Sequence, residues 1–228
     1  MSGLRSSFVA MAVLTACALS SGCSAEPAET EGDGISCEAT APASRTISCV
    51  RSLDLGEDAG FGEDEYPEII YGEPEGGGTG KGSTDVLSLG RGGSIVVGFG
   101  GGSVADGPGP DFIVFENPFN IGDDPEHPFK ELGEVSVSED GVTWLTFPCA
   151  REAFPYEGCA GWRPVLAGSE PGIDAFDPEQ AGGDPFDLAT LGLTTARFVR
   201  ITDISNAGGG GGTAGFDLDA VTVVHPAD

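Results

Sequence analysis

Glycine and proline interrupt this chain at short intervals, and this limits the length of any regular element. The two residues occupy nearly a quarter of the 228 positions, with 38 glycines and 16 prolines. Both are unfavourable inside helices, so the composition excludes a helical bundle. Hydrophobic residues still make up 39% of the chain, which is enough for a packed core. The sequence therefore predicts a folded domain of short segments joined by Gly- and Pro-rich loops.

The segments between these interruptions have the composition and the alternation of β-strands. In one of them Val135 and Val137 alternate with polar residues and are predicted to face inward. An Asp-Gly pair at positions 140 and 141 predicts a hairpin turn directly after it. The predicted strands cover residues 94–99, 111–116, 134–138, 143–147, 197–202 and 216–224. The only helical candidate is a short stretch at 185–191, so we expect an all-β sandwich or jelly roll with very little helix.

Three large side chains on these strands have no special chemistry assigned to them. Trp144 follows the Asp-Gly turn and is expected to pack in the core. Arg197 and Arg200 lie on one strand among many acidic residues, and we expect them to form salt bridges across the sheet.

The N-terminus is typical of an exported protein. Arg5 is the only charge before an apolar run at 8–19, which is too short to span a membrane comfortably. Small residues follow and lead to Cys23, so residues 1–22 resemble a bacterial lipoprotein signal peptide with lipidation at Cys23. Ser24 in the next position would then favour the outer membrane or cell surface. Ordinary signal cleavage near Ala25, which would leave a secreted soluble protein, is the alternative.

Composition divides the rest of the chain into three parts. Residues 23–34 are acidic and small and read as a flexible tether. Residues 35–52 contain two cysteines and are expected to form a disulfide-stapled N-terminal segment. Residues 53–228 show no further break in composition and are expected to form one β-sandwich domain.

Four cysteines remain after the signal segment and Cys23 are set aside. They form two couples that are close in sequence, and three connectivities are possible. The local pairing, Cys37 with Cys49 and Cys149 with Cys159, is the simplest in an oxidising compartment. A zinc site is the rival interpretation, but the chain has no Cys-x-x-Cys and only two histidines.

The charge balance excludes two classes of partner. Ten Lys and Arg residues stand against 37 Asp and Glu residues, which leaves a net charge of −27. A phosphate backbone requires clustered cations, so nucleic acid is excluded as a partner. Anionic lipid head groups are disfavoured for the same reason, so contact with a membrane is expected only through the lipid anchor.

Several motifs resemble a known family. Residues 138–144, 196–201 and 215–221 resemble the discoidin, or coagulation-factor C-type, domain, which belongs to the galactose-binding-like jelly rolls. The wider frame resembles bacterial secreted cell-surface protein domains, on stretches at 59–62, 66–67, 85–90, 109–117 and 183–188. The resemblance implies a jelly roll at the cell surface, with a carbohydrate as one ligand class, but it transfers no single activity.

Acidic residues beside Gly- and Pro-rich loops suggest a calcium site, because calcium takes six to eight oxygen ligands. Asp217 and Asp219 are two apart on a predicted strand, so both side chains should project from the same face. The resemblance adds that galactose-binding-like domains often hold a structural calcium ion. The candidate ligands are Asp217, Asp219, Asp184, Asp187, Asp111, Glu116 and Asn117. The alternative is that these are solvated acids or, for Asp184, a helix cap.

A ligand site is suggested by the loop between Cys149 and Cys159. It contains Arg151, Phe154 and Tyr156, and Trp162 follows just outside it. A loop rigidified by a disulfide could present aromatic rings to a sugar at low entropic cost. The alternative is that the aromatic rings simply cover the end of the sandwich.

No catalytic motif is present, so we expect a non-catalytic protein. Lys81 is followed by Gly82 and not by the Ser or Thr of a phosphate-binding loop, and no pair is singled out among 37 acids. The sequence thus predicts an exported, lipid-anchored, calcium-stabilised binding domain whose ligand is a glycan or matrix component. A structural envelope lipoprotein that contacts another protein is the alternative, and a carboxylate-based hydrolase is a third, weaker one.

Overall fold

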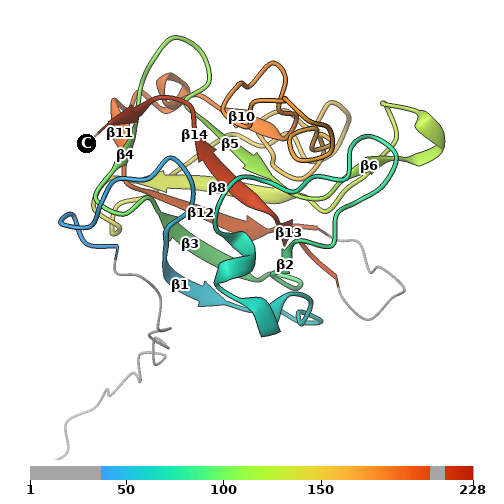
Figure 1. Ribbon diagram of the computed structural model, residues 1–228, viewed down its shortest axis with the longest axis horizontal. Helices are drawn as coiled ribbons and strands as arrows, with labels where there is room; N and C mark the ends of the chain where they lie inside the picture. Colours follow the sequence, from blue (N-terminus) through green and yellow to red (C-terminus); the bar gives the residue numbers. More distant parts are fainter. Residues whose placement is uncertain (1–36, 206–213, 228) are drawn as a thin grey trace, which may run out of the picture.

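The computed structural model describes residues 37–205 and 214–227. The predicted signal peptide, the lipidation site at Cys23 and the tether at 23–34 lie outside the described residues. Within these residues the only helices are four single turns of 3-10 helix: η1 (Glu63–Glu65), η2 (Glu68–Ile70), η3 (Ile121–Asp123) and η4 (Leu188–Leu191). The predicted all-β class with very little helix is therefore confirmed (Figure 1).

The larger sheet has five antiparallel strands in the order β1-β3-β12-β8-β9. Its strands are β1 (Cys49–Asp54), β3 (Ser94–Gly98), β12 (Phe198–Asp203), β8 (Gly133–Ser138) and β9 (Leu145–Thr146). The central strand β12 pairs with β8 along its whole length and with β3 over residues 198–202. Sequence-distant segments thus meet in the middle of the sheet.

The second layer is a three-stranded antiparallel sheet in the order β10-β5-β14. Its strands are β10 (Asp184–Phe186), β5 (Phe112–Phe115) and β14 (Ala220–Val223). Three smaller antiparallel sheets complete the fold. One has three strands, β11 (Thr195–Ala196), β4 (Ser103–Ala105) and β15 (Pro226–Ala227), with β4 in the middle. The other two are pairs: β13 (Asp217–Leu218) with β2 (Leu87–Ser88), and β6 (Phe119–Asn120) with β7 (Pro128–Phe129).

The main core lies between the two layers (Figure 1). Phe112 and Val114 of the small sheet and Val135 and Val199 of the large sheet belong to the same buried cluster. The opposite face of the small sheet is also covered, because the loop at 165–181 packs against Ile113 and its neighbours. Strand β5 is therefore buried on both faces, which explains why its sequence is continuously apolar instead of alternating.

The predicted hairpin is present between β8 and β9. The carboxylate of Asp140 accepts hydrogen bonds from the backbone N–H groups of Val142 and Thr143, at 2.8 and 2.7 Å. Gly141 adopts a left-handed conformation with φ of 71°, which a residue without a side chain adopts at little cost. The return strand is shorter than the predicted segment, since only Leu145 and Thr146 pair with β8.

Two predicted elements have different boundaries in the structure. The strand expected at 216–224 is divided at Asp219, where the chain changes partner from β2 to β5. The helix expected at 185–191 is helical only in η4, because Pro185 belongs to β10 and pairs with Ile113. Strand β10 lies at the edge of its sheet, where a proline costs no ladder hydrogen bond.

Trp144 and the strand arginines also differ from expectation. Trp144 is only half-buried, and the guanidinium of Arg200 lies 4.5 Å from the centre of its ring. Arg200 also donates to the hydroxyl of Ser136, and Arg197 donates to the carbonyl of Cys37. Neither arginine forms a salt bridge among the described residues. The guanidinium of Arg197 lies 5.3 Å from the centre of the Phe198 ring, so both arginines contact aromatic rings in place of the expected ion pairs.

Both predicted disulfides are present. Cys37 is bonded to Cys49 and Cys149 to Cys159, so the local connectivity is confirmed. Cys49 begins β1, and the stapled segment thereby joins the edge of the five-stranded sheet. Two disulfides indicate that the domain folds in an oxidising, exported environment.

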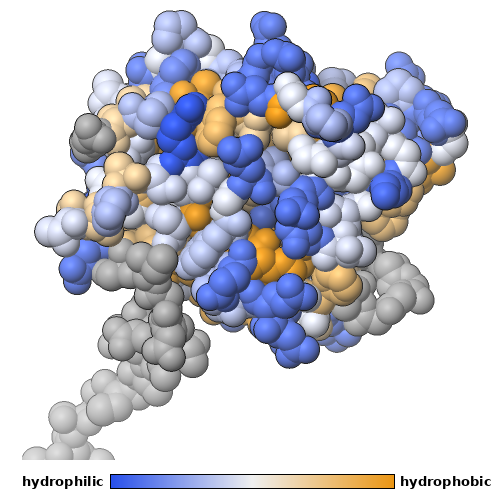
Figure 2. All heavy atoms as spheres, viewed as in Figure 1, coloured by the Kyte–Doolittle hydropathy of each residue, from blue (hydrophilic) through white to orange (hydrophobic). Residues whose placement is uncertain are grey.

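One face of the molecule is mainly hydrophilic. On the face shown in Figure 2, hydrophobic side chains are exposed only in small areas between hydrophilic ones. Within residues 37–205 and 214–227, no helix is long and apolar enough to cross the hydrocarbon core of a bilayer.

Candidate metal centre

Three carboxylates converge at one end of the sandwich. Glu116, Glu131 and Asp217 each offer an oxygen atom, and these atoms all lie within 4.8 Å of one another. Glu116 directly follows β5, Glu131 precedes β8, and Asp217 is the first residue of β13. We call these three residues the carboxylate centre. It joins segments that are far apart in the sequence.

Strand geometry explains why Glu116 points inward. Side chains two apart on a strand share a face, and Phe112 and Val114 both face the main core. Glu116 continues this row at the end of β5, where the backbone leaves the sheet. A charged residue therefore occupies a position that the strand pattern assigns to the interior.

Glu116 is the most unusual residue of the centre. Glu116 is 1% exposed, and within residues 37–205 and 214–227 neither of its carboxylate oxygens has a hydrogen-bond partner. Burial raises its pKa well above the ordinary value, and the neighbouring charges of Asp217 and Glu131 raise it further. The backbone N–H groups of Asn117 and Asp217 approach it and lower the pKa, but neither makes a hydrogen bond of ordinary geometry.

The other two acids of the centre are also perturbed. Glu131 accepts one hydrogen bond, from the backbone N–H of Gly215 at 2.9 Å, and burial raises its pKa to about 7. Burial also raises the pKa of Asp217, and one oxygen of this residue is buried without a partner in the described part of the chain. Three ionised carboxylates at this separation repel one another, so the centre can hold protons or a cation.

The side chain of Asn117 is not oriented as the sequence analysis expected of a calcium ligand. Its side-chain amide nitrogen donates to the carbonyl of Ser83 at 3.1 Å and lies 3.5 Å from Asp217 Oδ2. It thus turns a hydrogen-bond donor, and not its carbonyl oxygen, toward the carboxylate centre. This orientation favours a role for Asn117 in positioning the Asp217 carboxylate over a role as a metal ligand.

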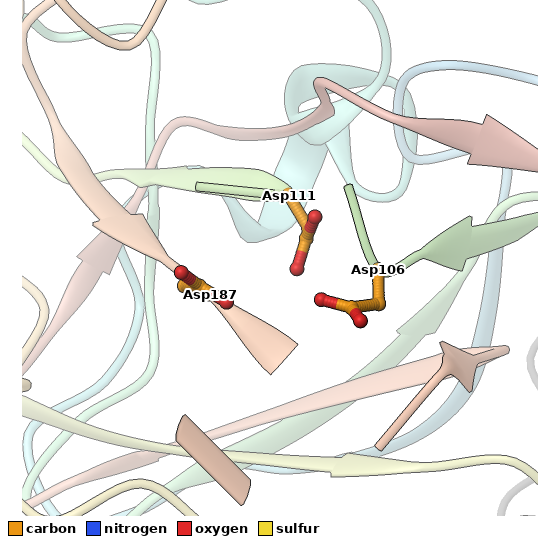
Figure 3. Close-up of side chains that lie close together, drawn as sticks. All are labelled: Asp106, Asp111 and Asp187. Carbon is orange, nitrogen blue, oxygen red and sulfur yellow. The ribbon is translucent and has the colours of Figure 1, made fainter. Parts of the chain in front are cut away.

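A second acidic group contains Asp111 and Asp187 together with Asp106 (Figure 3). The buried acid of this second group is Asp111, and it has hydrogen-bond partners within the protein. Asp111 accepts hydrogen bonds from the backbone N–H groups of Gly107 and Leu188, at 2.8 and 2.7 Å, and it lies 2.9 Å from the ring nitrogen Nδ1 of His225. These contacts explain its burial through the fold of the surrounding loops.

Asp187 has a local structural role as well. Its side chain accepts from the backbone N–H of Ala189 at 2.8 Å and caps η4. The cap that the sequence considered for Asp184 is therefore made by Asp187, three residues later, because the helix begins only after the strand ends.

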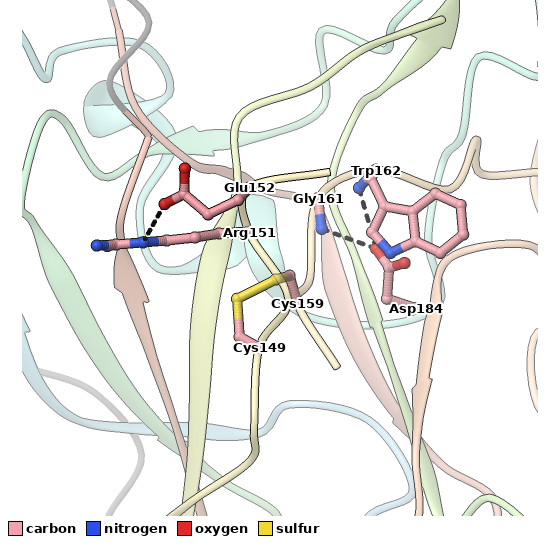
Figure 4. Close-up of a disulfide and its surroundings, with 7 residues drawn as sticks. All are labelled: Cys149, Arg151, Glu152, Cys159, Gly161, Trp162 and Asp184. Atoms are coloured by element: carbon pink, nitrogen blue, oxygen red, sulfur yellow. Dashed lines mark hydrogen bonds and ion pairs between the residues drawn. A yellow bond between two sulfur atoms is a disulfide. The ribbon is translucent and has the colours of Figure 1, made fainter. Parts of the chain in front are cut away.

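Asp184 and Asp219 lie outside both groups. Asp184 accepts from the backbone N–H groups of Gly161 and Trp162, at 2.7 and 3.2 Å, and burial raises its pKa to about 7 (Figure 4). Asp219 accepts from the N–H of Glu75 at 3.1 Å, and burial raises its pKa to about 8. Among the described residues, neither belongs to a group of three convergent ligands. Asp217 and Asp219 are separated because the strand is divided at Asp219.

The aromatic residues of the disulfide loop gather into one cluster. Phe154, Tyr156 and Trp162 pack edge to face, with ring centres 5.6 to 6.2 Å apart. Arg151 does not join them. It pairs with Glu152 at 3.4 Å on the exposed part of the loop, on the other side of the disulfide from Trp162 in Figure 4.

Sequence reasoning did not identify Glu131 or Asp106. Glu131 precedes an alternating strand and is one of 37 acids, so no local spacing distinguishes it. The one available signal is its place directly before Leu132, at the start of a segment that is buried. Only the tertiary structure brings it to Glu116, where its side chain accepts a hydrogen bond from Gly215, two residues before β13 begins.

Comparison with known proteins gives no family. Neither the models of protein families nor the curated protein sequences match this chain. The resemblance to discoidin domains therefore stays a prediction, and the carboxylate centre is the basis on which a function can be proposed.

Proposed function

We propose that this protein is an exported, non-catalytic binding domain of the cell surface, anchored by a lipid at Cys23. We further propose that its sandwich is stabilised by a calcium ion at the carboxylate centre, and that its ligand is a glycan. The two disulfides support export, because such bonds persist in oxidising compartments. The carboxylate centre supports the proposal that a calcium ion stabilises the sandwich.

A single observation carries the proposal of a cation, namely the burial of Glu116 without any hydrogen-bond partner among the residues that the structure describes. A buried ionised carboxylate costs several kcal/mol unless it is paired or coordinates a metal. Two further carboxylates lie within reach of it, and no Lys, Arg or His forms a salt bridge with any of the three among the described residues. A bound cation supplies the missing positive charge.

The ligand chemistry favours calcium among the common cations. All donors at the centre are carboxylate oxygens, which suit hard cations, and neither sulfur nor imidazole belongs to the group. Magnesium keeps several waters and requires octahedral geometry, which a buried centre satisfies poorly. Calcium accepts irregular geometry and bidentate carboxylates. The ion would connect the end of β5 with the approach to β8 and the start of β13.

Burial also supports a role in stability over a role in catalysis. Paired carboxylates that hydrolyse glycosides must contact the bond that they cleave. Glu116 is 1% exposed and Glu131 is 5% exposed, so a polysaccharide cannot reach either side chain without unfolding the end of the sandwich.

The experiment is a comparison of Glu116→Gln with Glu139→Gln in the exported protein with its disulfides formed. Glu139 is exposed in the β8–β9 turn, so this change removes the same charge without touching the centre. Calcium at 100 times its dissociation constant should stabilise the wild type and the control by about 2.7 kcal/mol. Thermal unfolding and titration calorimetry should show no such response in Glu116→Gln.

A measurement in chelator checks that Glu116→Gln is folded. Without calcium this variant should unfold at the same temperature as the wild type or higher, because it lacks a buried, repelled charge. The proposal is wrong if the wild type melts alike in calcium and chelator, or if Glu116→Gln keeps the full response. A larger response to magnesium than to calcium would contradict the choice of ion.

A further inference from the structure

Three arginines gather on the outer face of the five-stranded sheet, the face turned away from the main core. Val199 and Ile201 of β12 belong to the core cluster, so Arg200 between them points outward. Arg51 from β1 and Arg197 from the position before β12 reach the same face. We call Arg51, Arg197 and Arg200 the arginine face. It holds three of the ten Lys and Arg residues of a chain with net charge −27, so it does not reflect a generally basic surface.

Two of these positive charges lie against one ring. The guanidinium carbons of Arg51 and Arg197 lie 4.9 and 5.3 Å from the centre of the Phe198 ring. Two cations held at the same ring repel each other unless an anion lies beside them. Within residues 37–205 and 214–227 no acid forms an ion pair with the arginine face, and this includes Glu134, which shares the outer face of the sheet. The described residues therefore do not supply the balancing negative charge.

Stacking on aromatic rings leaves the hydrogen-bonding edges of these guanidinium groups available. A guanidinium carries five N–H donors in its plane, whereas a ring stacks only on its flat face. Arg200 donates to the hydroxyl of Ser136 at 3.4 Å, and Arg197 donates to the carbonyl of Cys37 at 3.3 Å. These two contacts leave most of the donors for carboxylates, which guanidinium groups bind in a bidentate manner.

The chain itself supplies an acidic segment next to the arginine face. Cys37, where the described residues begin, accepts the hydrogen bond from Arg197 and is bonded to Cys49 of β1, with 5.4 Å between the Cα atoms. The residues before it lie outside the described part of the chain, and their composition is known from the sequence. Between positions 24 and 36 there is no Lys or Arg, and there are four acids: Glu26, Glu29, Glu31 and Asp33.

The length of this segment is sufficient for the contact. An extended chain covers roughly 3.5 Å per residue, so Asp33 can lie up to about 14 Å from Cys37 and Glu26 up to about 38 Å. Arg51 is only two residues along β1 from Cys49, or about 7 Å. Covalent attachment gives the segment an effective concentration on the order of millimolar, so weak ion pairs suffice. A separate acidic protein would have to approach against the net charge of −27.

We propose that the arginine face binds the acidic segment at 26–33 of the same chain, with the carboxylates on the edges of the guanidinium groups. This contact fixes the direction in which the chain leaves the domain and covers the outer face of the large sheet. The inference goes beyond the proposed function. It does not depend on the carboxylate centre, because none of the three centre residues belongs to the five-stranded sheet.

The test measures how fast phenylglyoxal modifies each arginine of the exported full-length protein, followed by mass spectrometry of its peptides. A tether variant carries Glu26→Gln, Glu29→Gln, Glu31→Gln and Asp33→Asn. The arginine face should react at least about threefold faster in this variant than in the wild type, because a segment bound about two-thirds of the time protects it. Arg151 pairs with Glu152 outside the arginine face and should react at the same rate in both proteins.

A matched control variant neutralises four exposed acids elsewhere on the chain and should react like the wild type. Its substitutions are Glu63→Gln, Asp64→Asn, Glu65→Gln and Glu170→Gln. Sodium chloride at 1 M should remove the difference between wild type and tether variant, because the Debye length falls to about 3 Å. A peptide of residues 24–36, added at millimolar concentration to the tether variant, should slow the reaction again, and the same peptide with four amides should not.

Circular dichroism and intact disulfides check that every variant is folded. Faster modification that is confined to the arginine face and to the tether variant supports the inference. It is overturned if wild type and tether variant react at equal rates. Equal slow rates would mean that a different occupant covers the face, and equal fast rates that nothing does. Equal acceleration in the control variant would also overturn it, because net charge alone would then explain the effect.

Discussion

Asp184→Asn is expected to stabilise the protein, and to do so more strongly as the pH rises. Asp184 is 2% exposed. One of its carboxylate oxygens accepts from the N–H groups of Gly161 and Trp162, and the other has no partner among the described residues. Burial raises its pKa to about 7 from the ordinary 3.8, although the two N–H groups oppose the rise. Asparagine keeps a carbonyl oxygen for both donors and carries no charge.

The magnitude follows from the two pKa values. Between pH 3.8 and about 7 the carboxyl group keeps its proton in the folded state and loses it in the unfolded state. The folded state therefore binds more protons, and the free energy of unfolding falls as the pH rises through this window. This interval of pKa corresponds to roughly 4 kcal/mol as an upper value. Asparagine does not titrate, so the advantage of the variant should increase by about 3–4 kcal/mol from pH 4 to pH 8.

The assay is urea denaturation of wild type and variant at pH 4 and pH 8, with Asp64→Asn as the exposed control. The series is run in calcium and in chelator, and the increase should be the same in both, because Asp184 is not part of the carboxylate centre. An advantage that does not grow with pH would refute the assignment of the raised pKa to burial. An advantage present only in chelator would show that Asp184 binds the ion.

Three further predictions concern other parts of the fold. Glu131→Gln should weaken calcium binding at least about tenfold in calorimetry, because it removes one of three charged ligands; an unchanged affinity would exclude Glu131 from the centre. Replacing Cys149 and Cys159 together by alanine opens a loop of sequence separation 10 and should lower the free energy of unfolding by roughly 3 kcal/mol; an unchanged urea midpoint would contradict this. Hydrogen bonds from the backbone N–H groups of Thr143 and Val142 lower the pKa of Asp140 to about 2, so its contribution to stability is complete above the ordinary pKa of 3.8 and is lost as the pH falls through 2. Asp140→Ala should therefore lower the melting temperature at pH 7 and have little effect near pH 2, whereas an equal loss at both pH values would argue against this role.

Local sequence patterns predicted the structure correctly where the pattern and the element it predicts lie within one short segment. The alternation of Val135 and Val137 placed β8, the Asp-Gly pair placed its turn, and short cysteine spacing gave both disulfides. The same local reasoning overestimated the strand that ends in β14. Asp219 interrupts it because β13 and β14 pair with different strands, and no local pattern shows a change of partner.

The candidate site could be predicted only in part. Glu116 was a candidate as an acid beside a Gly- and Pro-rich loop, and Asp217 because it shares a strand face with Asp219. The structure brings Glu116 and Asp217 together. Glu131 was not found, and Asp111 and Asp187 turned out to be occupied by hydrogen bonds of their own loops. Whether an acid has a partner depends on backbone N–H groups that come from elsewhere in the chain.

The sequence by itself determined the class of this protein. Frequent glycine and proline exclude long helices, and alternating or continuous apolar segments require sheets, because both effects act within a few residues. Only the tertiary structure decided which buried acids have hydrogen-bond donors beside them and which do not. Among 37 carboxylates the difference between Glu116 and Asp111 is whether N–H groups from distant residues reach the oxygens, and chain folding alone sets that distance.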